Sequence, residues 1–140
     1  MNVRQSVVIR RDLLMSPGLL SAQVAHISAL WLHRLLEAAP AKGNKKRHVD
    51  VTIELSNEER QWLNGPVLSV LAVDTPEELD VVVKKAREVG VEVQTWRDTI
   101  RSQVFSSPEK PVYLEVIVGA SFGPDDEEKI KQVTGSLPLY

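Results

Sequence analysis

The sequence has no cysteine, and aromatic residues make up only 5% of its 140 positions. Without thiols the chain can form neither disulfide bonds nor thiolate metal sites, and such a composition suits a reducing compartment. No apolar run comes close to the roughly 20 residues that span a bilayer, and the run near the N-terminus is too short for the core of a signal peptide. We therefore expect a cytoplasmic protein without a membrane partner.

Common catalytic and nucleotide-binding signatures are also missing from the sequence. It contains no G-x-x-x-x-G-K-[ST] loop, no H-E-x-x-H zinc motif and no G-x-S-x-G nucleophile elbow. Its three histidines, His26, His33 and His48, do not have the spacing of a clustered ligand set. We therefore expect neither a metal site nor a cofactor.

What the sequence does contain fits a globular protein of one domain over residues 1–140. Hydrophobic residues make up 43% and charged residues 26% of the chain, which is long enough to bury a core. The net charge is −2, but eight basic and only two acidic residues precede position 49. This imbalance indicates either a face for a polyanion or acidic residues that coat solvated helix faces. The basic loop at residues 41–48, with Lys45, Lys46 and Arg47, is likewise either solvated or a phosphate contact.

The hydrophobic pattern alternates between strands and helices, which predicts a three-layer α/β fold with one mixed sheet and helices on both faces. Residues 67–73 are almost all apolar and predict a central strand buried on both faces. Residues 49–55 alternate strictly, which predicts a half-buried strand at a sheet edge or in a separate ribbon. Residues 119–124 are expected to form a glycine-containing loop. The strands of the sheet are predicted at residues 7–9, 67–73, 91–96 and 112–118.

A long apolar helix is predicted from about Leu19 to Ala39, after a break at Ser16, Pro17 and Gly18. Apolar residues cover much of its circumference. This is typical of a helix that packs between a sheet and a second surface, and a partner subunit in a homodimer is one candidate for that surface.

Polar side chains follow the first strand and lie on this first helix, close to the crevice where α/β folds bind ligands. Asp12 comes just after the strand. Gln23 and His26 are three positions apart, so they share one face of the helix. These residues are therefore candidates for a functional site.

Four stretches of the chain resemble motifs of one family, the type II peptidyl-tRNA hydrolases of archaea and eukaryotes. Together they cover nearly the whole chain, and it is their combination that is specific. V-V-I-R-R-D-L-L-M at residues 7–15 is similar to the family's R-x-D-L-x-M turn, and Gly18 with A-Q-V-A-H at residues 22–26 is similar to its G-K-x-x-A-Q-x-x-H helix. Asp98 with R-S-Q-V at residues 101–104 is similar to its D-A-G-R-T-Q-[IV] segment. G-P at residues 123–124 and V-T-G-S-L-P-L-Y at residues 133–140 are similar to its G-P and V-T-G-x-L-x-L-Y motifs.

The resemblance implies a peptidyl-tRNA hydrolase type II-like fold and hydrolysis of the ester that joins a peptide to the 3′ end of tRNA, with peptidyl-tRNA as partner. Such a site needs a positioned water, a group that takes its proton and a donor for the developing oxyanion. On this interpretation Asp98 orients or deprotonates the water, and Ser102 supplies a hydroxyl where the family has Thr. The candidate catalytic residues are Asp98, Ser102, His26, Gln23 and Asp12, which we expect to converge near the carboxyl ends of the first and third strands of the sheet.

Simpler roles exist for two of these residues, since Asp98 could cap a turn and His26 could be a satisfied, partly buried side chain. One departure from the family pattern also bears on catalysis. Leu19 stands where the family has a lysine, and leucine can neither stabilise an oxyanion nor bind phosphate. Any replacement cation would be an arginine, which does not substitute directly for lysine. The candidate substrate-binding residues are Arg10, Arg11, Arg101, Lys45, Lys46 and Arg47.

Three functions remain open at this point. The first is a divergent peptidyl-tRNA hydrolase. The second is a non-catalytic interaction or ligand-binding module on the same scaffold, because one fold can host many functions. The third is a hydrolase or binder of small molecules.

Overall fold

The computed structural model describes residues 2–42 and 49–140 of the chain. Its centre is a four-stranded sheet of β1 (Val3–Arg10), β4 (Leu68–Val73), β5 (Val93–Arg101) and β6 (Tyr113–Asp126), in the order β4-β1-β6-β5. β1 runs parallel to β4, and β6 runs antiparallel to both of its neighbours. The predicted mixed sheet and its four strands are therefore confirmed, although β5 and β6 are longer than the sequence pattern indicated.

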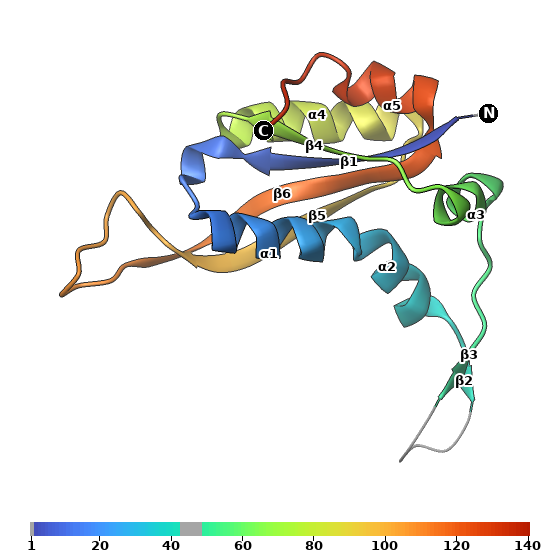
Figure 1. Ribbon diagram of the computed structural model, residues 1–140, viewed down its shortest axis with the longest axis horizontal. Coiled ribbons are helices and arrows are strands. Elements are labelled where there is room, and N and C mark those ends of the chain that lie inside the picture. Colours follow the sequence, from blue (N-terminus) through green and yellow to red (C-terminus); the bar gives the residue numbers. More distant parts are fainter. Residues whose placement is uncertain (1, 43–48) are drawn as a thin grey trace.

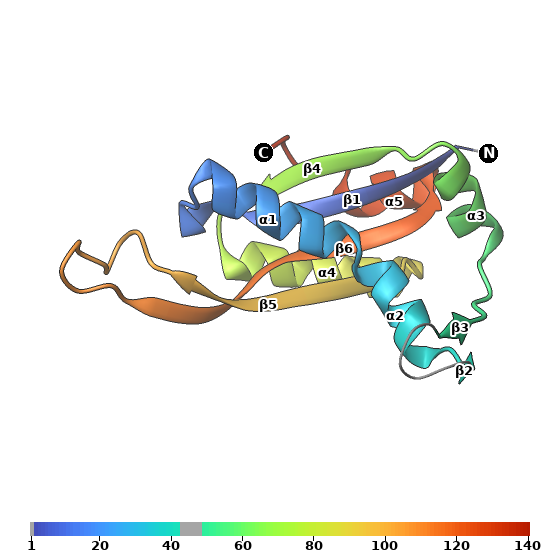
Figure 2. The ribbon, with the colours of Figure 1, turned by 60° about the horizontal axis from the view of Figure 1, so that its bottom comes forward.

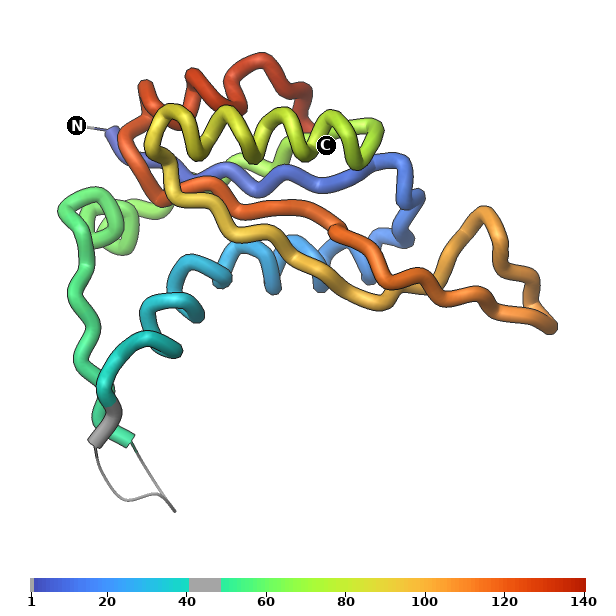
Figure 3. Tube along the Cα trace, turned by 180° about the vertical axis from the view of Figure 1, so that it is seen from behind, coloured from blue at the N-terminus to red at the C-terminus, as the bar shows by residue number. Residues whose placement is uncertain are grey.

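Helices cover both faces of this sheet, as predicted. Figures 1 and 3 show α1 (Pro17–Ser28) and α2 (Leu30–Ala38) along one face and α4 (Pro76–Val89) and α5 (Glu127–Thr134) along the other. In the ranges 2–42 and 49–140, no helix has the length and apolarity that crossing a bilayer requires. The remaining elements are η1 (Arg11–Leu13), β2 (Ala41–Lys42), β3 (Asp50–Val51) and α3 (Asn57–Asn64).

Two apolar cores form because successive side chains of a strand point to opposite faces. On β1, Val8 belongs to the core beneath α4 and α5, whereas Val7 and Ile9 belong to the core beneath α1. The first core adds Leu79, Val82, Val83, Ala86, Phe122, Ile130 and Val133, among others, and the second adds Met15, Ile27, Ile100 and Val118.

The prediction of a central strand at residues 67–73 is wrong, because β4 is an edge strand. Only its last three residues are buried. The chain end lies along the outer edge: the backbone N–H of Ala72 donates to the Pro138 carbonyl at 3.0 Å, and that of Tyr140 donates to the Val70 carbonyl at 3.1 Å. An apolar run does not distinguish a central strand from an edge strand that is covered by another segment.

Two local predictions also need correction. Of residues 49–55, only Asp50–Val51 forms a strand, and it pairs with Ala41–Lys42 in a separate ribbon, one of the two predicted arrangements. This ribbon projects away from the sheet beyond α2 (Figure 2). Residues 119–124 are not a loop but a buried continuation of β6 between β1 and β5.

Gly119 explains why a glycine-rich stretch can be a central strand here. A Cβ atom at this position would overlap the Val8 carbonyl oxygen and lie 3.1 Å and 3.2 Å from the Cδ1 atoms of Ile9 and Ile27. The bare backbone therefore lets α1, which carries Ile27, approach the sheet closely, and Gln23 of the same helix reaches β5.

Candidate active site

Helix α1 begins where the sequence predicted a break. The Ser16 hydroxyl accepts a hydrogen bond from the Leu19 backbone N–H at 3.4 Å, and Pro17 occupies the first turn, where its missing N–H costs nothing. The predicted long helix is divided at Ala29, after which α2 starts. On α1 the buried residues are Gln23 and Ile27, so the helix presents an amide and an apolar side chain to the sheet.

Strand β5 supplies the opposite wall of the site. Alternation places Trp96, Asp98 and Ile100 on one face of the strand. Ile100 is buried in the core beneath α1, and Trp96 packs against the same core. Asp98 lies between them and is half-buried. The carboxylate of Asp98 therefore faces α1.

Gln23 connects the two walls. Its Nε2 donates a hydrogen bond of 2.8 Å to Oδ2 of Asp98, and its Oε1 accepts a hydrogen bond of 2.7 Å from Nε1 of Trp96. Gln23 is only 2% exposed, so a buried amide has both of its ends satisfied. Oδ1 of Asp98 accepts a further hydrogen bond of 2.8 Å from the Thr99 backbone N–H. The carboxylate is therefore held through both oxygens.

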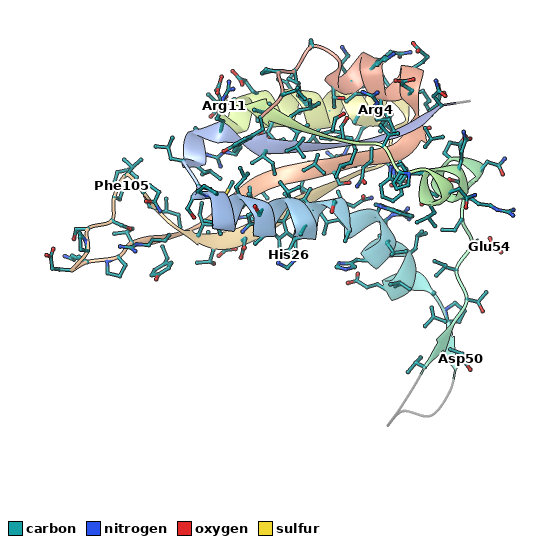
Figure 4. All side chains as sticks on the ribbon, in the orientation of Figure 1. Arg4, Arg11, His26, Asp50, Glu54 and Phe105 are labelled. Carbon is teal, nitrogen blue, oxygen red and sulfur yellow. The ribbon has the colours of Figure 1, made fainter. Side chains whose placement is uncertain are left out.

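His26 joins the same group by stacking. Its ring lies 5.3 Å from the ring of Trp96, centroid to centroid, with an interplanar angle of 14°. The side chain is exposed on α1 (Figure 4). Trp96 is thus the residue that connects His26 to Gln23 and Asp98. Sequence reasoning missed it, although its spacing of two from Asp98 on a strand was a usable signal.

Asp12 and Ser102, by contrast, belong to neighbouring local networks. Asp12 receives two hydrogen bonds from Arg10, at 3.2 Å from Nε and 2.8 Å from Nη2. The Ser102 hydroxyl accepts hydrogen bonds from the backbone N–H groups of Val104 and Phe105, at 3.2 Å and 3.0 Å. Ser102 is four positions beyond Asp98, which corresponds to about 13 Å along an extended strand. The structure therefore brings Gln23, His26 and Asp98 together and places Asp12 and Ser102 at the margin.

Arg10 lies at the point where β1 stops pairing with β6. The last β1–β6 pair is Ile9 with Gly119, and Nη1 of Arg10 then donates to the Ile117 carbonyl at 3.3 Å. Ile117 is next to Val116, the residue directly opposite Asp98 in the β5–β6 register. With a side chain that is 11% exposed, Arg10 is a largely buried cation at the end of β1, where it pairs with Val73 of β4.

The other arginine candidates are engaged elsewhere. Arg11 forms a two-pronged ion pair with Asp74, with distances of 2.8 Å and 3.1 Å. The hydrogen bond from Arg11 holds the pKa of Asp74 below its ordinary value, and Asp74 in turn raises the pKa of Arg11. Nη2 of Arg101 donates to the Ser107 carbonyl at 3.2 Å within the β5–β6 hairpin, which projects beyond the sheet (Figures 1 and 4). Lys45, Lys46 and Arg47 lie outside the described residues.

Leu19 lies one helical turn before Gln23, on the side of α1 that faces the sheet. It is half-buried and packs against the core that contains Ile100 and Met15. The position at which the family motif has a lysine is therefore filled by an apolar contact. In the part of the chain that the structure describes, no three His, Asp or Glu side chains gather where they could hold a metal ion.

The fold and the site define an α/β protein in which the amide of Gln23 on a helix holds the carboxylate of Asp98 on a strand. The family described as peptidyl-tRNA hydrolase PTH2 matches residues 3–140. The chain is 36% identical over 136 residues to a peptidyl-tRNA hydrolase of Nanoarchaeum equitans, covering 97% of this chain and 98% of that protein. It is 30% identical over 139 residues to a peptidyl-tRNA hydrolase of Haloquadratum walsbyi, covering 99% of this chain and 100% of that protein.

Among solved structures, a protein of unknown function from Agrobacterium tumefaciens superimposes with a TM-score of 0.56 at 16% identity, covering 100% of this chain and 98% of that chain. At this identity the likeness concerns the fold alone. The sequence matches decide the affiliation: this chain belongs to the peptidyl-tRNA hydrolase PTH2 family.

Proposed function

We propose that this protein hydrolyses the ester between a peptide and the 3′ end of tRNA. The observation that carries the proposal is the 2.8 Å hydrogen bond from Gln23 to Asp98, which fixes a half-buried carboxylate in a member of a peptidyl-tRNA hydrolase family. A carboxylate held through both oxygens still has lone pairs that can accept a proton from water. A non-catalytic module gains no support from the relatives, which are named as hydrolases.

In the proposed reaction Asp98 accepts one proton from a water molecule while the water oxygen attacks the ester carbonyl carbon. The carbonyl electron pair moves to oxygen and gives a tetrahedral oxyanion. When the intermediate collapses, the bond between the carbonyl carbon and the ribose oxygen breaks, and the ribose oxygen takes the proton from Asp98. The products are a peptide with a free carboxyl group and a tRNA with a free 3′-terminal hydroxyl, and the carboxylate of Asp98 is regenerated.

Arg10 is the arginine that we assign to the substrate's negative charge, in place of the family lysine. Its guanidinium contacts the β6 backbone at Ile117, one position from the residue opposite Asp98. Asp12 orients this guanidinium through two hydrogen bonds. A preorganised cation near a developing oxyanion or a phosphate lowers the barrier without rearrangement during the reaction. Arg11 and Arg101 are assigned to peripheral contacts, because Arg11 is an exposed partner of Asp74 and Arg101 bonds within the projecting hairpin.

The proposal extends to location and assembly. It makes tRNA the macromolecular partner, places the reaction in the cytoplasm and treats residues 1–140 as one domain. The family match over residues 3–140 supports this domain assignment. Exposed apolar side chains on the α2 end of the molecule, Leu36 at 44% and Val51 at 40% exposure, support a homodimer, which light scattering on the purified chain tests.

The test of the function measures peptide release from purified peptidyl-tRNA by the wild-type protein, by Asp98→Asn and by buffer alone. We expect release by the wild type and a loss of at least roughly 100-fold in kcat for Asp98→Asn, because a general base contributes about 10²–10⁴-fold. The matched control is Glu115→Gln, which changes an exposed carboxylate on the opposite face of the same hairpin. Its turnover should equal that of the wild type.

Two results would contradict the proposal. A folded wild-type protein that releases peptide no faster than buffer removes the activity. A folded Asp98→Asn protein with full turnover removes the role of Asp98 while leaving the activity in place.

A further inference from the structure

Trp96 determines which end of the Gln23 amide accepts a hydrogen bond and which end donates one. An indole N–H can only donate, and a glutamine side chain has one accepting end and one donating end. With Nε1 of Trp96 at 2.7 Å, the facing atom of Gln23 must be its carbonyl oxygen. The NH2 group must then face Asp98, and Oδ2 of Asp98 must be an acceptor.

The direction matters because Asp98 can bond to Gln23 in two ways. If the amide were reversed, its oxygen would face Oδ2, and only a protonated Asp98 could form the hydrogen bond. A reversed amide would also leave the indole N–H of Trp96 facing an NH2 group, which costs the energy of an unsatisfied donor in a part-buried place. The arrangement in the structure therefore favours Asp98 as a carboxylate with proton-accepting capacity, the state that a base requires.

The position of the Trp96 ring is itself fixed from two sides. His26 stacks on it at 5.3 Å with nearly parallel planes, and the apolar core that contains Ile100 packs against it. A ring held in this way cannot turn its N–H away from Gln23 without losing one of these contacts. Gln23 is buried to 2% exposure, so water does not readily take the place of the indole.

We propose that Trp96 is a positioning residue that acts through Gln23 to keep Asp98 in the proton-accepting arrangement. This inference rests on the proposed function for its catalytic consequence, but the orientation of the Gln23 amide is independent of turnover. Trp96 belongs to none of the sequence motifs described above, and it is connected to Asp98 only through Gln23.

The test replaces Trp96 by Phe, which keeps an aromatic ring for His26 and for the core but removes the N–H. We expect kcat on peptidyl-tRNA to fall roughly five- to tenfold, the effect of one lost orienting hydrogen bond, with KM within about twofold of the wild type. Trp62→Phe is the matched control. Trp62 also donates its indole N–H, to the Val67 carbonyl at 3.1 Å, but does so from α3. Its loss should leave kcat unchanged.

A second readout does not depend on activity. In proton–nitrogen NMR spectra, the side-chain NH2 signals of Gln23, assigned by their loss in Gln23→Met, should exchange slowly with solvent in the wild type and at least about tenfold faster in Trp96→Phe. Slow exchange that persists in a folded Trp96→Phe protein would overturn the proposal, as would an unchanged kcat. If the wild type lacks turnover, the proposed function fails, and the NMR result alone decides the role of Trp96.

Trp96→His restores an N–H donor on a planar ring and is the rescue variant for Trp96→Phe. Recovery of slow Gln23 exchange in Trp96→His supports the proposal. Fast exchange in a folded Trp96→His protein counts against it.

Discussion

Gln23 donates a hydrogen bond of 2.8 Å to Asp98 although the two residues are 75 positions apart in the chain. The amide comes from the second turn of α1, and the carboxylate comes from the part of β5 that leads into the projecting hairpin. This contact fixes the distance between helix and strand at the site. Leu19 lies one turn before Gln23 on the same side of α1. A longer side chain at position 19 would therefore reach along β5.

Leu19→Lys should therefore raise peptide release. The longer side chain can carry an ammonium group past the apolar core towards Asp98, where it would stabilise the oxyanion, a role that the proposed function gives to Arg10. We expect kcat/KM to rise at least roughly tenfold. The measurement is release from peptidyl-tRNA, with Ser21→Lys, at an exposed position, as the control for a new charge on the same helix. No gain in a folded Leu19→Lys protein would show that the site does not use a cation from this direction.

The basic residues Lys45, Lys46 and Arg47 give a prediction about tRNA affinity. Replacement of Lys45, Lys46 and Arg47 by Ala should weaken binding and flatten the dependence of log Kd on log salt concentration, because fewer counterions are released from the nucleic acid. Binding isotherms at several salt concentrations measure the slope. A control triple variant that removes Lys84, Lys85 and Arg87 from α4 should keep the wild-type slope. An unchanged slope in the variant of residues 45–47 would show that these side chains are solvated and do not contact tRNA.

Gly119→Ala should destabilise the protein by about 1–3 kcal/mol. The new Cβ atom would overlap the Val8 carbonyl oxygen and crowd Ile27 of α1, so the sheet and the helix must move apart. Urea denaturation measures the loss in free energy of unfolding. Gly18→Ala is the control, since a Cβ atom there has no neighbour within 4 Å. Equal stability of the two variants would contradict the close approach of α1 to β6.

The ion pair between Arg11 and Asp74 predicts a pH dependence of stability. Because Arg11 lowers the pKa of Asp74 below its ordinary value of 3.8, the pair stabilises the folded state fully above that value. The contribution is lost as pH falls through the lowered pKa of the folded protein. Asp74→Asn should therefore be slightly less stable than the wild type from about pH 7 to pH 5, and the difference should vanish in strong acid. A difference that grows towards acid pH would have the wrong sign.

Local sequence signals predicted local structure well. The start of the first helix, predicted at the break of Ser16, Pro17 and Gly18, is confirmed, because the Ser16 cap and the Pro17 ring act on atoms within one turn of the helix. The four strands of the sheet were predictable for a similar reason. The edge position of β4 was not, since it depends on the segment that lies along its outer side.

The site shows the same division. Asp98, Gln23 and His26 could be nominated from their resemblance to family motifs. The indole N–H that Trp96 donates reaches Gln23 across 73 positions, and no local pattern encodes that partner. The β6 segment that begins at Gly119 was predicted as a loop for a related reason. In a sequence, glycine is typical of a turn, and its second use, to let a helix pack closely on a strand, becomes visible only once the position of the helix is known.

The sheet order has a consequence for the synthesis of the chain. β6 lies between β1 and β5 but follows both of them in the chain, and its Ser121 hydrogen-bonds Gln5 across 116 positions. While a ribosome is still translating the residues before β6, β1 and β5 have no strand to separate them, and their apolar side chains stay uncovered. Such long-range pairing slows folding and leaves the nascent chain open to wrong partners. A cell that makes this protein therefore has to keep a nearly finished but unassembled chain from aggregating until its central strand emerges.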